Sequence, residues 1–357
     1  MWEENNVTSL LTIDYPIIQA GMAGGVTTPE LVAAVSNAGG LGTIGAGYMS
    51  EEDLKQAIRS TKQLTAKPFG VNVFVPEDVR VPESEIDAAN ELLQPFHREL
   101  QVAPSKSASH SSATFQKQID VIIAEEVPVC SFTFGIPSKT IIHRLKSHDI
   151  RLIGTATTVK EARLNEQAGM DMVVAQGSEA GGHRGTFDTS FEQSSVGTMS
   201  LVPRVVDTVS LPVIAAGGIM DARGILAATV LGAEGVQMGT AFLTAQESGA
   251  KPPHKKAILH SDGDDTVITS AFSGKPARGI ENAFIRYLRL YEHNLPAYPV
   301  MNTLTKEIRK AAGSLDRPEF MSLWAGQSAS LSQEISAGQL VKQLVEDIKI
   351  QNERSIL

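Results

Sequence analysis

Eight short apolar runs that alternate with helix-forming segments constrain this chain more than any other feature of its sequence. The runs are residues 15–20, 41–45, 69–75, 127–133, 151–156, 170–175, 211–216 and 235–238. Alternation of strand and helix indicates a parallel sheet covered by helices, because each helix returns the chain to the same edge of the sheet. Eight such units close a TIM (β/α)8 barrel. We therefore predict an α/β fold of this type.

A doubly wound open sheet is the competing fold, and its fingerprint is G-x-G-x-x-G in the turn from the first strand into a helix. The pattern occurs at Gly40, Gly42 and Gly45. It enters and spans the second predicted strand there instead of joining a strand to a helix, so we discount it. Thr28 and Asp221 have the side chains of helix N-caps and start two of the intervening helices.

The length of 357 residues accommodates a barrel of about 250 residues and an appendage of about 100. We assign residues 1–245 to the barrel, with an insertion on its rim near 77–112. Residues 246–317 form a small added α-rich domain after strand eight. Residues 318–357 form a C-terminal helical segment that returns to the barrel.

Composition restricts the class of partner. Hydrophobic residues make up 42% of the chain, and the net charge is −9, which argues against a nucleic-acid surface. The single cysteine, Cys130, excludes an internal disulfide, and the scattered histidines lack metal-ligand spacing, so we assign no metal. No signal peptide and no membrane-spanning run are visible, so we expect a cytoplasmic protein. The oligomeric state stays open.

The loop after the sixth predicted strand is the first candidate site. Residues 175–185 read AQGSEAGGHRG, with four glycines and one histidine. Glycine lets backbone approach a ligand closely, and His183 is suited to proton transfer. The alternative is a glycine-rich turn with an incidental surface histidine.

Two further glycine turns follow strands seven and eight, where barrels of this kind bind phosphate. They carry Gly217 and Gly218 in one turn and Gly239 and Thr240 in the other. Their backbone amides can point at an anion, although glycines at these positions also simply permit tight turns.

Two amide side chains, Asn72 in strand three and Gln176 at the end of strand six, complete the candidate site. They can hydrogen-bond a planar heterocycle or satisfy backbone groups in the barrel mouth. Together with a phosphate site they suggest flavin mononucleotide (FMN).

The chain resembles the nitronate monooxygenase family, formerly called 2-nitropropane dioxygenase. The matching segments are PIIQAGMAGG (16–25), SNAGGLGTIGAG (36–47), GVNVFVP (70–76), AQGSEAGGHRG (175–185), PVIAAGGI (212–219) and GAEGVQMGTAFL (232–243). The resemblance implies non-covalent FMN in a TIM barrel, with His183 as the active-site histidine. It implies FMN contacts for Asn72, Gln176, Gly181, Gly217, Gly218, Gln237, Met238, Gly239 and Thr240, and places Met22, Ala23 and Gly24 beside the flavin ring.

The activity implied by this resemblance is oxidation of alkyl nitronates, such as propionate 3-nitronate, by O2 to carbonyl compounds and nitrite, as a detoxification. His183 would act as a base towards a neutral nitroalkane or hydrogen-bond the nitro group of a nitronate.

Three alternatives remain at this stage. The closest is a related FMN barrel, either an NAD(P)H-dependent enoyl-acyl-carrier-protein reductase or an NAD(P)H:quinone reductase. A barrel like inosine-monophosphate dehydrogenase would need a loop cysteine as nucleophile, whereas Cys130 falls within a predicted strand and is interpreted as a core residue. The third alternative is a non-enzymatic flavin or nucleotide sensor.

Overall fold

A computed structural model describes residues 2–77, 79–105 and 112–355 of the chain. Eight parallel strands form one sheet in the order β1-β9-β8-β6-β5-β4-β3-β2. They are β1 (Ile17–Gln19), β2 (Gly42–Gly45), β3 (Phe69–Phe74), β4 (Val129–Thr133), β5 (Arg151–Ala156), β6 (Met172–Gln176), β8 (Val213–Ala216) and β9 (Gly235–Met238). Each overlaps one of the eight predicted strands.

The sheet closes where its first and last strands in the order meet. Ile18 in β1 bridges Leu41 just before β2. The N–H of Gln19 donates to Leu41 O, and the N–H of Leu41 donates to Ile17 O, both at 2.9 Å. Closure leaves no free edge, which confirms the TIM-barrel prediction.

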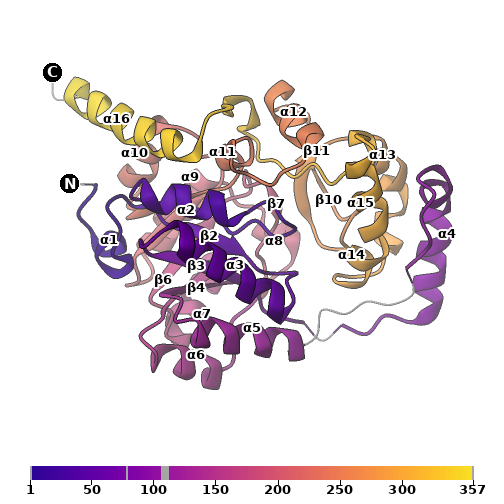
Figure 1. Cartoon of the computed structure of the whole chain (residues 1–357), viewed down its shortest axis with the longest axis horizontal. Coiled ribbons are helices and arrows are strands. Elements are labelled where there is room, and N and C mark those ends of the chain that lie inside the picture. Colours follow the sequence, from indigo (N-terminus) through magenta and orange to yellow (C-terminus); the bar gives the residue numbers. More distant parts are fainter. Residues whose placement is uncertain (1, 78, 106–111, 356–357) are drawn as a thin grey trace.

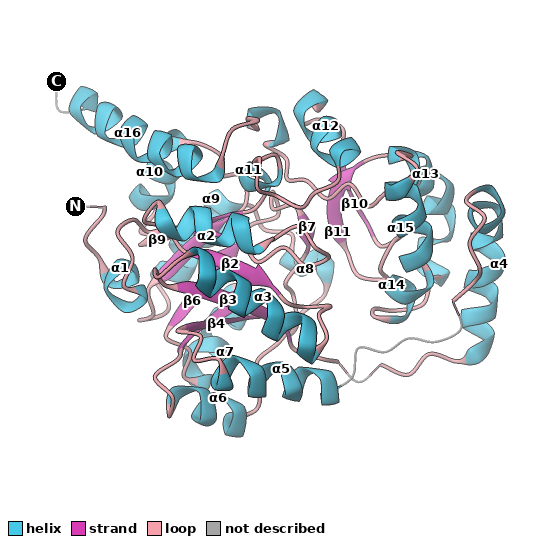
Figure 2. Cartoon of the chain, in the orientation of Figure 1, coloured by secondary structure: helices cyan, strands magenta, loops and turns pink. Residues whose placement is uncertain are grey.

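Helices cover the outside of the barrel (Figure 2). They are α2 (Pro29–Asn37), α3 (Glu51–Leu64), α5 (Ser112–Ala124), α6 (Lys139–Lys146), α7 (Val159–Ala168), α9 (Thr198–Val206) and α10 (Ala222–Val230). Thr28 accepts from the N–H of Leu31, and Asp221 accepts from those of Arg223 and Gly224. Both predicted N-caps are therefore confirmed.

The N-terminal end of the barrel is closed by α1 (Asn6–Leu11), which was not predicted. Val7 and Leu11 join the apolar cluster inside the barrel with Ile18 and Val129. The side chain of Asn5 donates to Glu234 O, just before β9, at 2.7 Å. The carboxyl ends of the strands are thus left to form the site.

The segment after strand eight contributes helices and a small sheet. Its elements are α11 (Thr240–Leu243), α12 (Pro252–His260), β10 (Thr266–Thr269), β11 (Ala277–Ile280), α13 (Ala283–Leu288), η1 (Arg289–Asn294), α14 (Val300–Leu304) and α15 (Lys306–Ser314). The three-stranded sheet β10-β11-β7 includes β7 (Gly182–His183) from the loop after β6. Ala277 pairs with His183, and Arg278 pairs with Gly182. The added segment therefore holds the histidine loop of the barrel.

The insertion near 77–112 contains α4 (Glu83–Glu99). Figure 1 shows α4 beside the helices of the added segment. The Phe96 ring lies 4.6 Å from that of Phe284 and 5.4 Å from that of Phe320, between ring centroids. Burial of these rings fastens α4 to the added segment. Residues 106–111 of the predicted insertion lie outside the described residues.

The C-terminal segment contains η2 (Pro318–Phe320), η3 (Ala329–Leu331) and α16 (Ala337–Ser355). α16 packs on α2 and α10 outside the barrel. Leu340, Val341 and Leu344 are buried in the same apolar cluster as Leu31 and Ile225, which returns the chain to the barrel wall. Within the described ranges, no helix is long and apolar enough to cross a membrane.

Candidate active site

The loop after β6 folds back over the barrel mouth and is clamped by Gln176. The Gln176 side chain donates from Nε2 to His183 O at 3.1 Å, and its Oε1 accepts the N–H of Gly185 at 2.8 Å. A Cβ on Gly185 would lie 2.8 Å from the Thr155 methyl group. Glycine is therefore required where the loop crosses the lumen.

His183 lies among three aromatic rings from distant parts of the chain. Its ring centroid is 5.4 Å from Trp324, 5.8 Å from Phe134 and 6.0 Å from Tyr298. Phe134 follows β4 directly and has a φ of 71°, a left-handed conformation that non-glycine residues rarely adopt outside constrained sites. The half-buried imidazole is thus part of a packed pocket.

Ser273 determines which imidazole nitrogen carries the proton. His183 Nε2 lies 2.8 Å from Ser273 Oγ, and that hydroxyl donates to Lys275 O at 3.0 Å. A hydroxyl has one proton to donate, and a carbonyl oxygen can only accept it. Nε2 therefore carries the hydrogen that it donates to Ser273, which leaves the lone pair on Nδ1.

The field around His183 disfavours its protonation. Burial, followed by the positive charges of Lys275 and Arg309, lowers the pKa of His183 to about 3. Lys275 Nζ is 3.1 Å from Glu77 Oε1 and 4.8 Å from the centroid of the Phe134 ring. The imidazole is neutral at pH 7, and the surrounding cations favour an anionic ligand.

Tyr298 adds a buried phenol to this pocket. Its hydroxyl interacts with that of Tyr48. Burial raises the pKa of Tyr298 well above its usual range, so the phenol stays protonated. The pocket around His183 therefore contains a neutral phenol as well as aromatic rings.

Two successive residues in the turn after β8 have the left-handed backbone conformation that favours glycine. Gly217 and Gly218 have φ values of 109° and 74°. A Cβ on Gly217 would lie 3.1 Å from both Ala180 N and Gly177 O. The absence of a side chain at Gly217 therefore lets this turn pack closely against the loop after β6.

The N-terminus of α9, next to the turn after β8, already binds the carboxylate of Glu179. Both carboxylate oxygens of Glu179 accept the N–H of Thr198 at 2.9 Å, and Oε2 also accepts its hydroxyl. A phosphate would be repelled from that helix end.

Residues 325–328, which we call the strap, join the two glycine turns. The N–H of Gly326 donates to Thr240 Oγ1 at 3.0 Å. The Ser328 hydroxyl donates to Gly218 O at 3.1 Å. Gly181 faces the strap, where a Cβ would lie 2.6 Å from the backbone of Ala325 and Gly326.

Three further predicted residues lie at the mouth, and one faces away from it. Asn72 donates from Nδ2 to Ser131 Oγ at 2.9 Å and to Thr133 Oγ1 at 3.1 Å. A Cβ on Gly239 would lie 3.7 Å from Met22 Sδ. The residues that follow β1 and β9 are therefore close neighbours. The side chain of Met238 instead packs in the core, and its carbonyl accepts the N–H of Ala20.

Three more predicted residues, Ala23, Gly24 and Gln237, lie after β1 or in β9. Gly24 has a φ of 90°, and a Cβ on Gly45 would lie 2.6 Å from Ala23 N. Gln237 is half-buried in β9. The amide side chains of Asn72 and Gln176 can hydrogen-bond a planar heterocycle, and the left-handed glycine turn after β8 is a backbone conformation that can present amides to an anion.

Two solved structures share the fold of this chain over nearly its whole length. The crystal structure of nitroalkane oxidase from Streptomyces ansochromogenes superposes with a TM-score of 0.92 and 38% identity, over 98% of this chain and 99% of that one. FabK from Thermotoga maritima has a TM-score of 0.79 and 35% identity, over 99% of both chains. The fold and these neighbours define an oxidoreductase of the flavin-dependent TIM-barrel class.

The sequence comparisons specify the family. The family model described as Nitronate monooxygenase matches residues 4–347. A protein of Staphylococcus haemolyticus named probable nitronate monooxygenase is 54% identical over 351 residues, covering 98% of each chain, and a Staphylococcus aureus protein of the same name is 54% identical over 349 residues. This chain belongs to the nitronate monooxygenase family.

Most of the residues around His183 were not predicted from the sequence. Ser273, Lys275 and Tyr298 lie in the added segment, and the local pattern there is too short to indicate a role. Phe134 offered a usable signal, because it stands at the carboxyl end of a barrel strand, where active sites of this fold lie. Cys130 is fully buried in β4, which confirms that it is a core residue.

Proposed function

We propose that the protein oxidises alkyl nitronates at this site, with FMN as cofactor and O2 as oxidant, to carbonyl compounds and nitrite. The observation that carries the proposal is the environment of His183. Its neutral imidazole is oriented by Ser273 and lies in the field of two cations, Lys275 and Arg309. A nitronate is an anion, and this field stabilises it on binding.

The low pKa favours a nitronate over a neutral nitroalkane. A nitroalkane would have to give its α-proton to Nδ1, but an imidazole with a pKa of about 3 is a weak base. An anionic nitronate offsets the two cations and raises the affinity of Nδ1 for a proton from solvent. Nδ1 can then donate a hydrogen bond to the nitro group.

A bound flavin would supply the electron acceptor for the nitronate. We assign the phosphate to the turns at Gly217, Gly218, Gly239 and Thr240. We assign the ring to the mouth between Asn72, Gln176 and the loop of Met22, Ala23 and Gly24. The strap would exclude water from the phosphate end, because Gly326 and Ser328 bond both turns.

A spectrum and a paired assay test this proposal. The purified protein should show flavin absorption bands and release FMN on denaturation. It should consume O2 with propionate 3-nitronate in the absence of NADH, and turn over 3-nitropropionate more slowly. A matched solution of free FMN controls for reaction without protein. A protein that cannot be reconstituted with FMN would contradict the cofactor assignment.

The likeness to FabK from Thermotoga maritima, at 35% identity, supports a second candidate. This is the NAD(P)H-dependent enoyl-acyl-carrier-protein reductase, or a related NAD(P)H:quinone reductase. NADH oxidation by a flavin-containing protein that ignores nitronates would establish this class instead. The predicted detoxifying role and cytoplasmic location belong to the nitronate proposal and stay predictions.

A further inference from the structure

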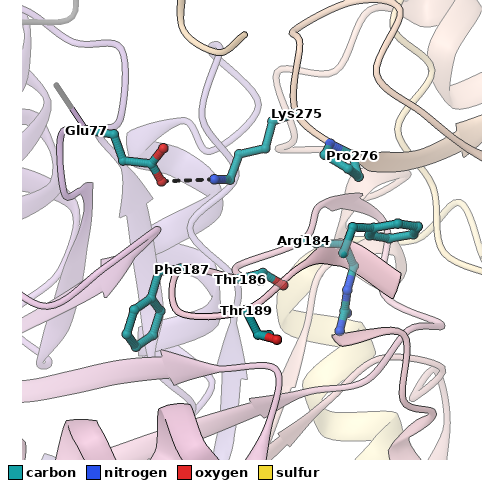
Figure 3. Close-up of a pocket in the computed structure, with 8 residues that line it drawn as sticks. Glu77, Arg184, Thr186, Phe187, Thr189, Lys275 and Pro276 are labelled. Carbon is teal, nitrogen blue, oxygen red and sulfur yellow. Dashed lines mark hydrogen bonds and ion pairs between the residues drawn. The ribbon is translucent and has the colours of Figure 1, made fainter. Parts of the chain in front are cut away.

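The residue after His183 is an arginine whose side chain is buried. Arg184 is 1% exposed and lines a cavity of about 240 Å³ together with Glu77 and Lys275. Figure 3 shows its guanidinium directed away from the ion pair between those two side chains. Burial lowers the pKa of Arg184 to about 10, so the group is charged at pH 7. A buried charge is costly unless hydrogen bonds satisfy it, so the acceptors of this guanidinium indicate its role.

The acceptors of Arg184 are backbone carbonyls of its own loop. Nη2 donates to Gln176 O at 3.0 Å and to Ser194 O at 2.9 Å, and Nη1 donates to Gly177 O. All three oxygens are neutral, and Nε is buried without a partner among the described residues. Such a guanidinium adds little stability, because an apolar side chain of similar volume would avoid the cost of desolvation. What the three bonds do provide is a fixed backbone conformation for the loop.

A second buried arginine holds the next carbonyl of the same loop. Arg278 in β11 is 9% exposed and donates from Nε to Ser178 O at 3.1 Å. Its backbone pairs with Gly182 in β7, and its carbonyl accepts the N–H of Ala325 in the strap at 3.3 Å. Three consecutive carbonyls, those of residues 176–178, therefore accept hydrogen bonds from guanidinium groups. Because each peptide unit is planar, these bonds fix the orientation of consecutive peptide planes.

Gln176 connects these carbonyls to His183. Its carbonyl accepts from Arg184, and its side chain bonds His183 O and the N–H of Gly185. Three hydrogen bonds thus join Gln176 to three consecutive residues and close the loop at its base. Rotation of the peptide at Gln176 would displace the His183 backbone and strain the contact of 2.8 Å between His183 Nε2 and Ser273 Oγ.

We propose that Arg184 and Arg278 are positioning residues for His183. They hold the carbonyls at the base of its loop and, through Gln176, keep the imidazole in contact with Ser273. The proposal rests on the proposed function, in which His183 contacts the nitronate. Neither guanidinium needs to touch the substrate, because both act through backbone carbonyls.

Lysine substitutions test the proposal, since lysine keeps the positive charge but lacks the planar fork of donors. In the Arg184→Lys holoenzyme, kcat/KM for propionate 3-nitronate should fall about tenfold, because a single ammonium cannot reach all three carbonyls. Arg278→Lys affects one carbonyl and should lower it about threefold. Arg59→Lys is the matched control, since it changes an exposed arginine that pairs with Glu125 outside the barrel, and it should keep the wild-type value.

Nitrogen NMR of the holoenzyme with isotope-labelled histidine reads the orientation of the ring directly. The resonances of His183, assigned by their loss in His183→Asn, should show one tautomer with the hydrogen on Nε2 in the wild type. In Arg184→Lys they should show exchange between both tautomers, because the bond to Ser273 is no longer held. His254, which donates to Trp324 O at 2.9 Å, should keep one tautomer and report that the fold is intact.

The two measurements separate the possible outcomes. An unchanged tautomer of His183 in both arginine variants would overturn the proposal, whatever the rates. A changed tautomer in a protein that oxidises no nitronate would support the positioning role and contradict the proposed function. If Arg184→Lys does not fold, the tautomer in Arg278→Lys decides the question.

Discussion

At the scale of single residues, His183 shows that contacts from a distant segment decide what a side chain can do. An exposed histidine titrates near neutral pH, but burial and two cations keep this one neutral far below that range. Ser273, 90 residues away in sequence, accepts a hydrogen bond from the N–H at Nε2. The tautomer and the charge of the imidazole are therefore properties of its neighbours.

Removal of the Ser273 hydroxyl tests the assigned tautomer. We expect Ser273→Ala to lower kcat/KM for a nitronate about fivefold, because one hydrogen bond of about 1 kcal/mol no longer orients the ring. FMN content should not change. Ser147→Ala is the matched control, since it removes an exposed serine–histidine contact, with His148, at the surface. Equal rates in the Ser273 variant and the wild type would contradict the assignment.

The low pKa of His183 also predicts how stability depends on pH. The folded-state pKa of about 3 lies below the ordinary value of 6.5, so the unfolded chain binds this proton first as the pH falls. Stability is therefore complete above pH 6.5 and declines from there towards pH 3. Between pH 7 and pH 5 the loss through this one group should be about 2 kcal/mol.

Urea unfolding of the wild type and of His183→Asn at both pH values measures this effect. His254 is a second buried histidine with a lowered pKa, of about 4, and it contributes to the pH dependence of both proteins. The difference between the two proteins isolates His183. Between pH 7 and pH 5, the His183→Asn variant should lose about 2 kcal/mol less stability than the wild type. Parallel pH dependences would show that His183 is not protected from protonation.

At the scale of elements, two irregular segments form the site between regular strands and helices. The loop after β6 is shaped by glycines and clamped by Gln176. The strap then crosses it and bonds the turns after β8 and β9. Neither segment could be placed by periodicity, because the strap and the two-residue strand β7 are too short to show a repeat.

The contact between Gly181 and the strap gives a prediction at this scale. In Gly181→Ala, the added methyl would lie 2.6 Å from the strap backbone, so the strap must move at a cost of about 1–3 kcal/mol. We expect FMN to bind at least tenfold more weakly, as measured by the fluorescence of flavin released on dilution. Gly338→Ala serves as the control, because its methyl would meet only Ala34 O, at 3.7 Å. Wild-type affinity in the Gly181 variant would mean that the strap plays no part in binding FMN.

At the scale of the whole molecule, the pocket around His183 is assembled from three regions. The barrel supplies the histidine loop and Phe134, the added segment supplies Lys275 and Tyr298, and the C-terminal segment supplies Trp324. Pairing of β7 with β11 makes the added segment continuous with the barrel loop. Substrate selectivity is thus expected to vary with the added segment while the barrel keeps the cofactor.

The sequence by itself determined the barrel, its helix caps and the glycine turns at the carboxyl ends of the strands. These features depend on local patterns: apolar runs, capping side chains such as Thr28, and glycines at positive φ such as Gly217. Only the tertiary structure decided the tautomer and the charge of His183 and brought Lys275 close enough to act on it. Hydrogen bonds, burial and electric fields depend on distance in space, and residues 90 positions apart leave no local pattern that relates them.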